Sequence, residues 1–238
     1  MTASPPWFDP TPPDRSKCVT AALIDKAFTD CPDKVFAVFE DESEITYAEL
    51  YHETRRRAAA LQKIGLKKDD KVLVWLPNSR HMLLSWFAIN YAGGSYVPIN
   101  TSYRGPLLEH VIANSGASLM IAHTKLIERL QDTELAQLTT VVSVGEHSGE
   151  INKLNILPET ALEAQEEELL TIPDTMPWDI HSIIYTSGTT GPSKGVLSPY
   201  CHHYTIATVG YRFMHSADRM MVNMPLFHVS GTAAVYSA

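Results

Sequence analysis

The alternation of short apolar runs with helical patterns between residues 71 and 144 most constrains the fold of this chain. The apolar runs predict strands at Lys71–Leu76, Ser95–Ile99, Leu119–Ala122 and Val141–Val144. The patterns between them predict helices at residues 79–91, 105–114 and 125–138. Because strands that alternate with helices at this spacing are joined by right-handed βαβ crossovers, the sequence predicts an α/β fold with a mostly parallel sheet and helices on both faces.

The segment before residue 71 predicts a helix, a hairpin and a second helix. Apolar residues recur at helical spacing from Val19 to Asp30, and residues 35–39 form a β-rich run that an acidic turn separates from the next segment. Thr46 and Glu49 have the spacing of a capping box, and Gly65 is suited to end the helix that follows.

Between residues 145 and 179 the order weakens. This segment contains three prolines and an acidic run, which consists of Glu163, Glu166, Glu167 and Glu168. It predicts a short acidic helix within a long surface connection.

Composition excludes several function classes. The chain has 238 residues, 45% of them hydrophobic and 19% charged, and its net charge of −8 offers no basic surface for nucleic acid or an anionic membrane. Residues 1–17 contain five prolines and no apolar run, so they predict an extended N-terminal arm rather than a signal peptide or membrane span. The cytoplasm is therefore the expected location, and the oligomeric state stays open, with a homo-oligomer among the options.

The cysteines and histidines do not predict a metal site. Cys18, Cys31 and Cys201 are sparse and form no C-x-x-C pair, so they predict three reduced thiols. His202 and His203 are adjacent, so on a helix they point in different directions.

The stretch Tyr185–Val196, with the sequence YTSGTTGPSKGV, is typical of a loop that binds phosphate. Its glycines, Gly188, Gly191 and Gly195, permit positive φ and close approach of backbone N–H groups to an anion. Its hydroxyls and the ammonium of Lys194 add donors for phosphate oxygens. The alternative is a Gly/Ser/Thr-rich surface turn that contains a lysine by chance.

The spacing in this stretch differs from a Walker loop, because Lys194 follows Gly191 by three residues and Gly195 comes next. Ser198 and Pro199 form a good N-cap and first-turn pair, so the next helix is expected to start there. The loop therefore lies between two short extended segments, the first of which ends with Ile183 and Ile184.

This string closely resembles the phosphate-loop signature of the adenylate-forming superfamily, which includes acyl-CoA synthetases, peptide-synthetase adenylation domains and luciferases. It has Ser193 where the commonest form has proline. Three further stretches match the superfamily in the same order: Ile45–Leu50 (ITYAEL), Asn90–Tyr103 (NYAGGSYVPINTSY) and Asn223–Gly231 (NMPLFHVSG). The resemblance covers the chain from about residue 45 to its end.

The resemblance implies activation of a carboxylic acid by MgATP to an acyl-adenylate and pyrophosphate, followed by transfer to coenzyme A. The cofactors implied are ATP, Mg²⁺ and coenzyme A. Preorganised donors and a cation at the β- and γ-phosphates would stabilise the charge that develops on the departing pyrophosphate. The residues implied are Thr186, Ser187, Gly188, Thr189, Thr190, Gly191 and Lys194.

His228 is the second catalytic candidate, because in similar acyl-CoA synthetases the matching position lies where the acyl pocket meets the α-phosphate. It follows the apolar run Met220–Val222, which predicts a strand that ends near it. The alternative is an ordinary core histidine. No aspartate occurs nearby to hold an amino-acid ammonium, which favours an acid without an α-amino group, and PLFHVSGTAA is similar to the crotonobetaine/carnitine-CoA ligase branch.

Members of the superfamily are about twice as long, and several of their later motifs have no match here. Residues 18–238 are therefore expected to form part of an adenylate-forming N-terminal domain, and this chain alone is expected to be inactive. Two alternatives stay open: a non-catalytic module that binds nucleotide or phosphate, and an adenylating enzyme whose acceptor is a carrier protein or oxygen.

Overall fold

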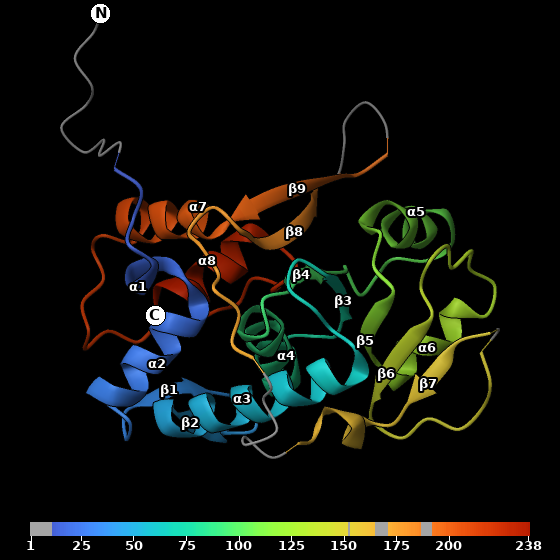
Figure 1. The fold of residues 1–238 in the computed structure, drawn as a ribbon, viewed down its shortest axis with the longest axis horizontal. Helices are drawn as coiled ribbons and strands as arrows, with labels where there is room; N and C mark the ends of the chain where they lie inside the picture. Colours follow the sequence, from blue (N-terminus) through green and yellow to red (C-terminus); the bar gives the residue numbers. More distant parts are fainter. Residues whose placement is uncertain (1–10, 152, 165–170, 187–191) are drawn as a thin grey trace, which may run out of the picture.

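The computed structural model describes residues 11–151, 153–164, 171–186 and 192–238 (Figure 1). The strands are β1 (Val35–Val38), β2 (Glu44–Thr46), β3 (Lys71–Trp75), β4 (Ser95–Pro98), β5 (Leu119–His123), β6 (Thr140–Val144), β7 (Asn155–Leu157), β8 (Ile180–Thr186) and β9 (Lys194–Pro199). The helices are α1 (Arg15–Cys18), α2 (Thr20–Asp30), α3 (Tyr47–Ile64), α4 (Arg80–Tyr91), α5 (Gly105–Ser115), α6 (Thr124–Ile127), α7 (Tyr200–Thr205) and α8 (Val229–Ser237). Shorter helical turns are η1 (Glu128–Leu130), η2 (Glu159–Leu162) and η4 (Ile206–Gly210).

The main sheet has the strand order β7-β6-β5-β3-β4-β8-β9, and β1 and β2 form a separate antiparallel hairpin. Every neighbouring pair from β7 to β8 is parallel, whereas β9 runs antiparallel to β8. The predicted α/β class with a mostly parallel sheet is therefore confirmed.

The strands are apolar throughout because successive side chains enter two different cores. Val72 and Val74 of β3 pack with α3 and α4 on one face of the sheet. Leu73 and Trp75, between and after them, pack with α5, α6 and η1 on the other face. Helices therefore cover both faces, as expected, and the two cores share the sheet as their common wall.

Local signals placed the ends of α3 and α4. Thr46 and Glu49 form the predicted capping box at the start of α3, and Gly65 ends this helix in the left-handed region at φ 111°. The side chain of Ser79 accepts a hydrogen bond from the backbone N–H of Met82 at the start of α4.

The chain leaves the neighbouring strands β3 and β4 in opposite directions. After β3 it enters α4 on one face, and after β4 it enters α5 on the other. In open α/β sheets, a crevice forms where connections diverge in this way at the carboxyl ends of adjacent strands. The ends of β3 and β4 therefore mark the expected place of a binding site.

One predicted helix differs from the structure. The helix expected at residues 125–138 ends with η1, because Thr133 donates its hydroxyl to the carbonyl of Arg129 and the chain then turns through Ala136 at φ 48°. The short acidic helix expected between residues 145 and 179 includes Glu166, Glu167 and Glu168, which lie outside the described residues, so it stays a prediction; the described part of this segment contains β7 and η2. Because β7 has only three residues, it is too short for a periodic pattern to predict it.

Two predictions near the C-terminal half are also wrong. Ser198 lies in β9 and Pro199 is the N-cap of α7, so the helix starts at Tyr200 rather than at the Ser-Pro pair. Met220–Val222 is not a strand, and Met221 is 84% exposed. An apolar run becomes a strand only where its backbone groups find a partner strand, and these residues do not pair.

The expected N-terminal arm is described from Thr11 onward, and its last residues belong to the short helix α1. The α1 segment lies beside α7 and α8, where Tyr236 donates its hydroxyl to the carbonyl of Cys18 (Figure 1). No helix in the described ranges combines the length and apolar character needed to cross a membrane.

Candidate active site

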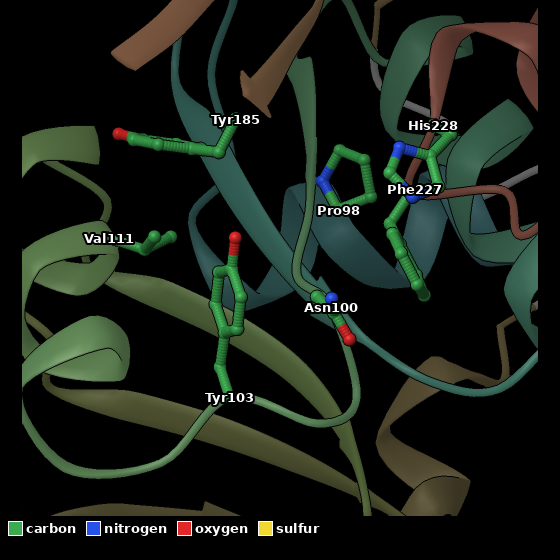
Figure 2. A pocket seen from close by; sticks show the side chains of 7 residues that line it. All are labelled: Pro98, Asn100, Tyr103, Val111, Tyr185, Phe227 and His228. Atoms are coloured by element: carbon green, nitrogen blue, oxygen red, sulfur yellow. The ribbon is translucent and has the colours of Figure 1, made fainter. Parts of the chain in front are cut away.

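A pocket of about 200 Å³ lies at the carboxyl edge of the parallel strands (Figure 2). Its lining residues come from four parts of the chain and are Pro98, Asn100, Tyr103, Val111, Tyr185, Phe227 and His228. Figure 2 shows Tyr103 and Tyr185 on one side and Phe227 and His228 on the other, with Pro98 between them. The pocket therefore occupies the crevice that the diverging connections of β3 and β4 predict.

His228 lines this pocket from the N-cap position of α8, not from the end of a strand. Its backbone carbonyl accepts hydrogen bonds from the N–H groups of Gly231 and Thr232, both at 3.1 Å. Its side chain is exposed and lies against Phe227, with ring centroids 4.8 Å apart. The imidazole is thus held at the rim of the pocket, where it is accessible to a bound molecule.

The segment that carries His228 is anchored to the sheet by Asn78, which follows β3. The side chain of Asn78 donates to the carbonyl of Met224 at 3.0 Å and accepts from the N–H of Leu226 at 2.9 Å. A Cβ on Gly231 would lie 2.5 Å from the carbonyl oxygen of Pro225, so this position requires glycine. The close approach at Gly231 explains the glycine of the PLFHVSG sequence, and Asn78 fixes the backbone on either side of Pro225.

The candidate phosphate loop connects β8 to β9. Its central residues, Ser187, Gly188, Thr189, Thr190 and Gly191, lie outside the described part of the chain. Thr186 and Lys194 are opposite each other at the two ends of this connection, and the hydroxyl of Thr186 lies 3.5 Å from the carbonyl oxygen of Lys194. The expected arrangement, a loop between two extended segments, is confirmed.

Lys194 fits the requirements of a phosphate ligand. Its side chain is exposed, and no carboxylate among the described residues forms an ion pair with it. An ammonium group without a carboxylate partner is available to an anionic ligand. Whether Thr186 and Lys194 bind ATP stays a prediction.

Gly195 is needed for a reason that differs from the predicted one. It lies within β9 and does not adopt positive φ. A Cβ at this position would lie 2.9 Å from the Cγ2 atom of Ile183 and 3.2 Å from the ring of Tyr185. The glycine therefore lets β9 close over two side chains of β8.

The hairpin of β8 and β9 is fastened to α5 by two contacts that the sequence did not reveal. The Nε2 atom of His110 lies 2.6 Å from the carbonyl oxygen of Ser193 and donates to it, and the hydroxyl of Tyr185 donates to Asn114 at 2.8 Å. Burial raises the pKa of Tyr185 to about 12, so this phenol stays protonated and remains a donor at neutral pH. A helix that lines the pocket thus also positions the base of the candidate phosphate loop.

Tyr103, Asn100 and Pro98 were also absent from the predicted site residues. All three lie within the stretch Asn90–Tyr103 that resembles the superfamily, so that resemblance was the signal that could have found them. His110 has no comparable signal. His202 and His203 do point in different directions, as predicted, since His202 is exposed and His203 is buried.

The described residues contain no group of three or more His, Cys, Asp or Glu side chains that could hold a metal ion. The three cysteines are free thiols. The pocket and hairpin together present one ammonium, one imidazole, several hydroxyls and a largely aromatic wall. Such a set can bind an anionic group beside an apolar one.

Residues 24–238 match the AMP-binding enzyme family. The chain is 30% identical over 211 residues to a 2-succinylbenzoate–CoA ligase from a Geobacillus species. This match covers 88% of this chain and 39% of the relative. It is also 30% identical over 205 residues to a feruloyl-CoA synthase from an Amycolatopsis species. That match covers 84% of this chain and 38% of the relative.

Among solved structures, the anthranilate CoA ligase AuaEII in complex with anthranoyl-AMP has a similar fold, with a TM-score of 0.81 at 22% identity. The match covers 92% of this chain and 42% of that one. The chain thus spans about two fifths of the length of the relatives it matches. It belongs to the AMP-binding, adenylate-forming enzyme family and is similar to acyl-CoA ligases of that family.

Proposed function

We propose that this chain is part of an enzyme that activates a carboxylic acid with ATP and transfers the acyl group to coenzyme A. The observation that carries the proposal is the position of Tyr185. This residue lines the pocket together with His228, and it also pairs across the hairpin with Gly195, the neighbour of Lys194. The pocket and the candidate phosphate loop therefore share strand β8.

In this reaction an oxygen of the carboxylate attacks the α-phosphorus of ATP, and the bond from that phosphorus to the bridging oxygen of pyrophosphate breaks. The products are the acyl-adenylate and pyrophosphate, and a thiol then displaces AMP. Lys194 and Thr186 would stabilise the negative charge that grows on the pyrophosphate, while His228 would contact the reacting acid at the pocket rim. Mg²⁺ bound with ATP would neutralise further phosphate charge.

The names of the relatives support a coenzyme A acceptor, because the two quoted above are a CoA ligase and a CoA synthase. The pocket wall is mostly aromatic and apolar, which suits the organic part of an acid better than a second highly charged group. We place Thr186, Lys194 and His228 in the site together with residues 187–191. We also propose that the enzyme is cytoplasmic.

Carboxylate-dependent exchange between ATP and pyrophosphate tests the proposal directly. The assay uses the longest polypeptide that the gene encodes and a panel of short, medium, aryl and betaine-type acids. Exchange with one class of acid establishes adenylate formation. Lys194→Ala is expected to reduce this exchange about 100-fold, the typical effect of removing one charge-stabilising donor.

Lys71→Ala is the matched control, because Lys71 is an exposed lysine at the opposite end of the parallel strands. It should leave exchange unchanged. ATP binding without exchange for any acid would instead support a non-catalytic nucleotide-binding module. Exchange without a CoA thioester product would point to a carrier protein or oxygen as the acceptor.

A further inference from the structure

The wall of the pocket that carries Asn100 and Tyr103 is a short connection between β4 and α5, here called the pocket loop (residues 100–103). Its own hydrogen bonds are local: the N–H of Tyr103 donates to the carbonyl of Asn100 at 3.0 Å, and the N–H of Ser102 donates to the Asn100 side chain at 2.9 Å. These two bonds define a turn. They do not fix where the turn lies relative to the sheet.

Arg129 of η1 supplies a fixed support for this loop. Its Nη1 atom donates to the carbonyl of Thr101 at 2.6 Å and lies 3.4 Å from the carbonyl of Tyr103. One guanidinium thus contacts carbonyl groups on both sides of Ser102. Hydrogen bonds with a charged donor are about twice as strong as neutral ones.

The guanidinium of Arg129 is itself held by Trp75, the last residue of β3. Its Cζ atom lies 5.6 Å from the centre of the Trp75 ring, a cation–π distance. Trp75 is fully buried, and its Nε1 donates to the carbonyl of Asn100 at 3.2 Å. Trp75 and Arg129 together therefore bind three of the four carbonyl groups of the pocket loop.

We propose that Arg129, resting on Trp75, is a positioning residue that sets the place of Asn100 and Tyr103 and thereby the fit of the acid in the pocket. This proposal rests on the function proposed above. Arg129 does not line the pocket, so it acts on a bound acid only through the loop. The pocket loop also leads directly into α5, so the same support fixes the start of the helix that carries Val111 and His110.

A purely structural role for Arg129 predicts a different result. If the side chain only stabilised the fold, its loss would lower the melting temperature and reduce the amount of active enzyme, with the KM for the acid unchanged. If it positions the pocket loop, its loss raises the KM for the acid in the fraction that is folded. The split between KM and kcat therefore separates the two roles.

The experiment compares Arg129→Ala, Arg129→Lys and Glu128→Ala in the longest polypeptide that the gene encodes. Glu128 is an exposed neighbour in the same helical turn and serves as the control. For Arg129→Ala, we expect the KM for the acid to rise about 10-fold, as the loss of hydrogen bonds to a charged donor predicts, with a much smaller change in kcat.

Arg129→Lys should restore part of this loss, because an ammonium keeps the charge but lacks the planar group that stacks on Trp75 while contacting two carbonyls. It is also the milder variant if Arg129→Ala folds poorly. An unchanged KM in folded Arg129→Ala, or equal effects from Glu128→Ala, would overturn the proposal.

Hydrogen–deuterium exchange of the amides of Ser102 and Tyr103 provides a readout that does not depend on activity. We expect both amides to exchange faster in Arg129→Ala and to stay protected in Glu128→Ala. Unchanged protection in Arg129→Ala would show that Arg129 does not hold the loop. If the unmodified protein shows no acid-dependent exchange between ATP and pyrophosphate, the proposed function fails, and the role of Arg129 in acid binding fails with it. The amide exchange data still decide whether Arg129 holds the pocket loop.

Discussion

The imidazole rings of His181 and His203 pack against each other with their planes tilted by 43° and their centroids 4.0 Å apart, and both residues are fully buried. His181 belongs to β8, the strand that leads into the candidate phosphate loop, and His203 belongs to α7. The Nε2 atom of His181 accepts a hydrogen bond from the indole of Trp86 at 3.0 Å, but its Nδ1 atom has no hydrogen-bond partner among the described residues. The pair therefore joins two elements of the site region through two neutral rings.

The first prediction is that acid destabilises this protein through these rings. Burial, followed by the charge of His202, lowers the pKa of His203 from 6.5 to about 4, and burial also lowers the pKa of His181 well below its ordinary value. As the pH falls through this window, the unfolded chain binds protons that the folded protein does not bind, so stability is present above pH 6.5 and is lost below it. A shift of one pKa unit corresponds to about 1.4 kcal/mol. The shift of His203 alone therefore lowers the free energy of unfolding by about 3 kcal/mol as the pH falls from 6.5 to about 4.

Urea unfolding at a series of pH values measures this effect. His203→Leu should be less sensitive to acid than the unmodified protein over the same range, whereas His215→Ala, which removes an exposed histidine outside α7, should behave as the unmodified protein does. An equally steep loss of stability in His203→Leu would contradict the prediction.

The second prediction concerns Gly195, where an added methyl group would collide with Ile183 and Tyr185. Gly195→Ala should destabilise the protein by about 1–3 kcal/mol, as overpacking of a filled site does, and should weaken ATP binding because β9 carries Lys194. Thermal unfolding and equilibrium binding of ATP measure the two effects.

Gly210→Ala is the matched control, since its Cβ would lie 3.8 Å from the nearest side-chain atom. Ile183→Ala removes the closest clashing atom, so Gly195→Ala should cost less stability in the Ile183→Ala background than in the unmodified protein. If Gly195→Ala and Gly210→Ala have equal effects, the close approach of β9 to β8 is not what requires the glycine.

The third prediction concerns Asn90, a buried side chain that joins α4 to β8. Its amide donates to the carbonyls of Gly94 at 3.1 Å and His181 at 2.9 Å, while its oxygen accepts from the indole of Trp86 at 2.8 Å. Asn90→Asp keeps the shape but replaces the donor with an oxygen that faces two carbonyls. We expect a loss of at least about 3 kcal/mol of stability at neutral pH.

Asn114→Asp provides the control for the same chemical change. Asn114 is exposed, and its oxygen accepts a hydrogen bond from Tyr185, a role that a carboxylate also fills. Its free energy of unfolding should change by less than about 0.5 kcal/mol. Urea unfolding of both variants at neutral pH measures the difference, and equal values would show that the amide donors of Asn90 are not required.

The site could be predicted from the sequence only in part. The order of the motifs indicated that Lys194 and His228 belong to the same kind of enzyme. In the structure, His228 lines a pocket with Tyr185, and Tyr185 pairs across the hairpin with Gly195, the neighbour of Lys194. His110 and Arg129 had no signal, because their roles depend on backbone carbonyls of distant residues. Every residue has a backbone carbonyl, so the sequence does not show which distant side chain will donate a hydrogen bond to a particular one.

The sequence by itself determined the parallel sheet, the two helical layers and the ends of α3 and α4. These features depend on periodicity and on residues within one helical turn, which act locally and leave a readable pattern. The tertiary structure alone decided that Tyr103 and His228 line one pocket, that the rings of His181 and His203 pack together and that Met220–Val222 pairs with none of the described strands. Such contacts join residues far apart in the chain, and they depend on which buried surfaces and backbone groups find partners once the two cores have formed.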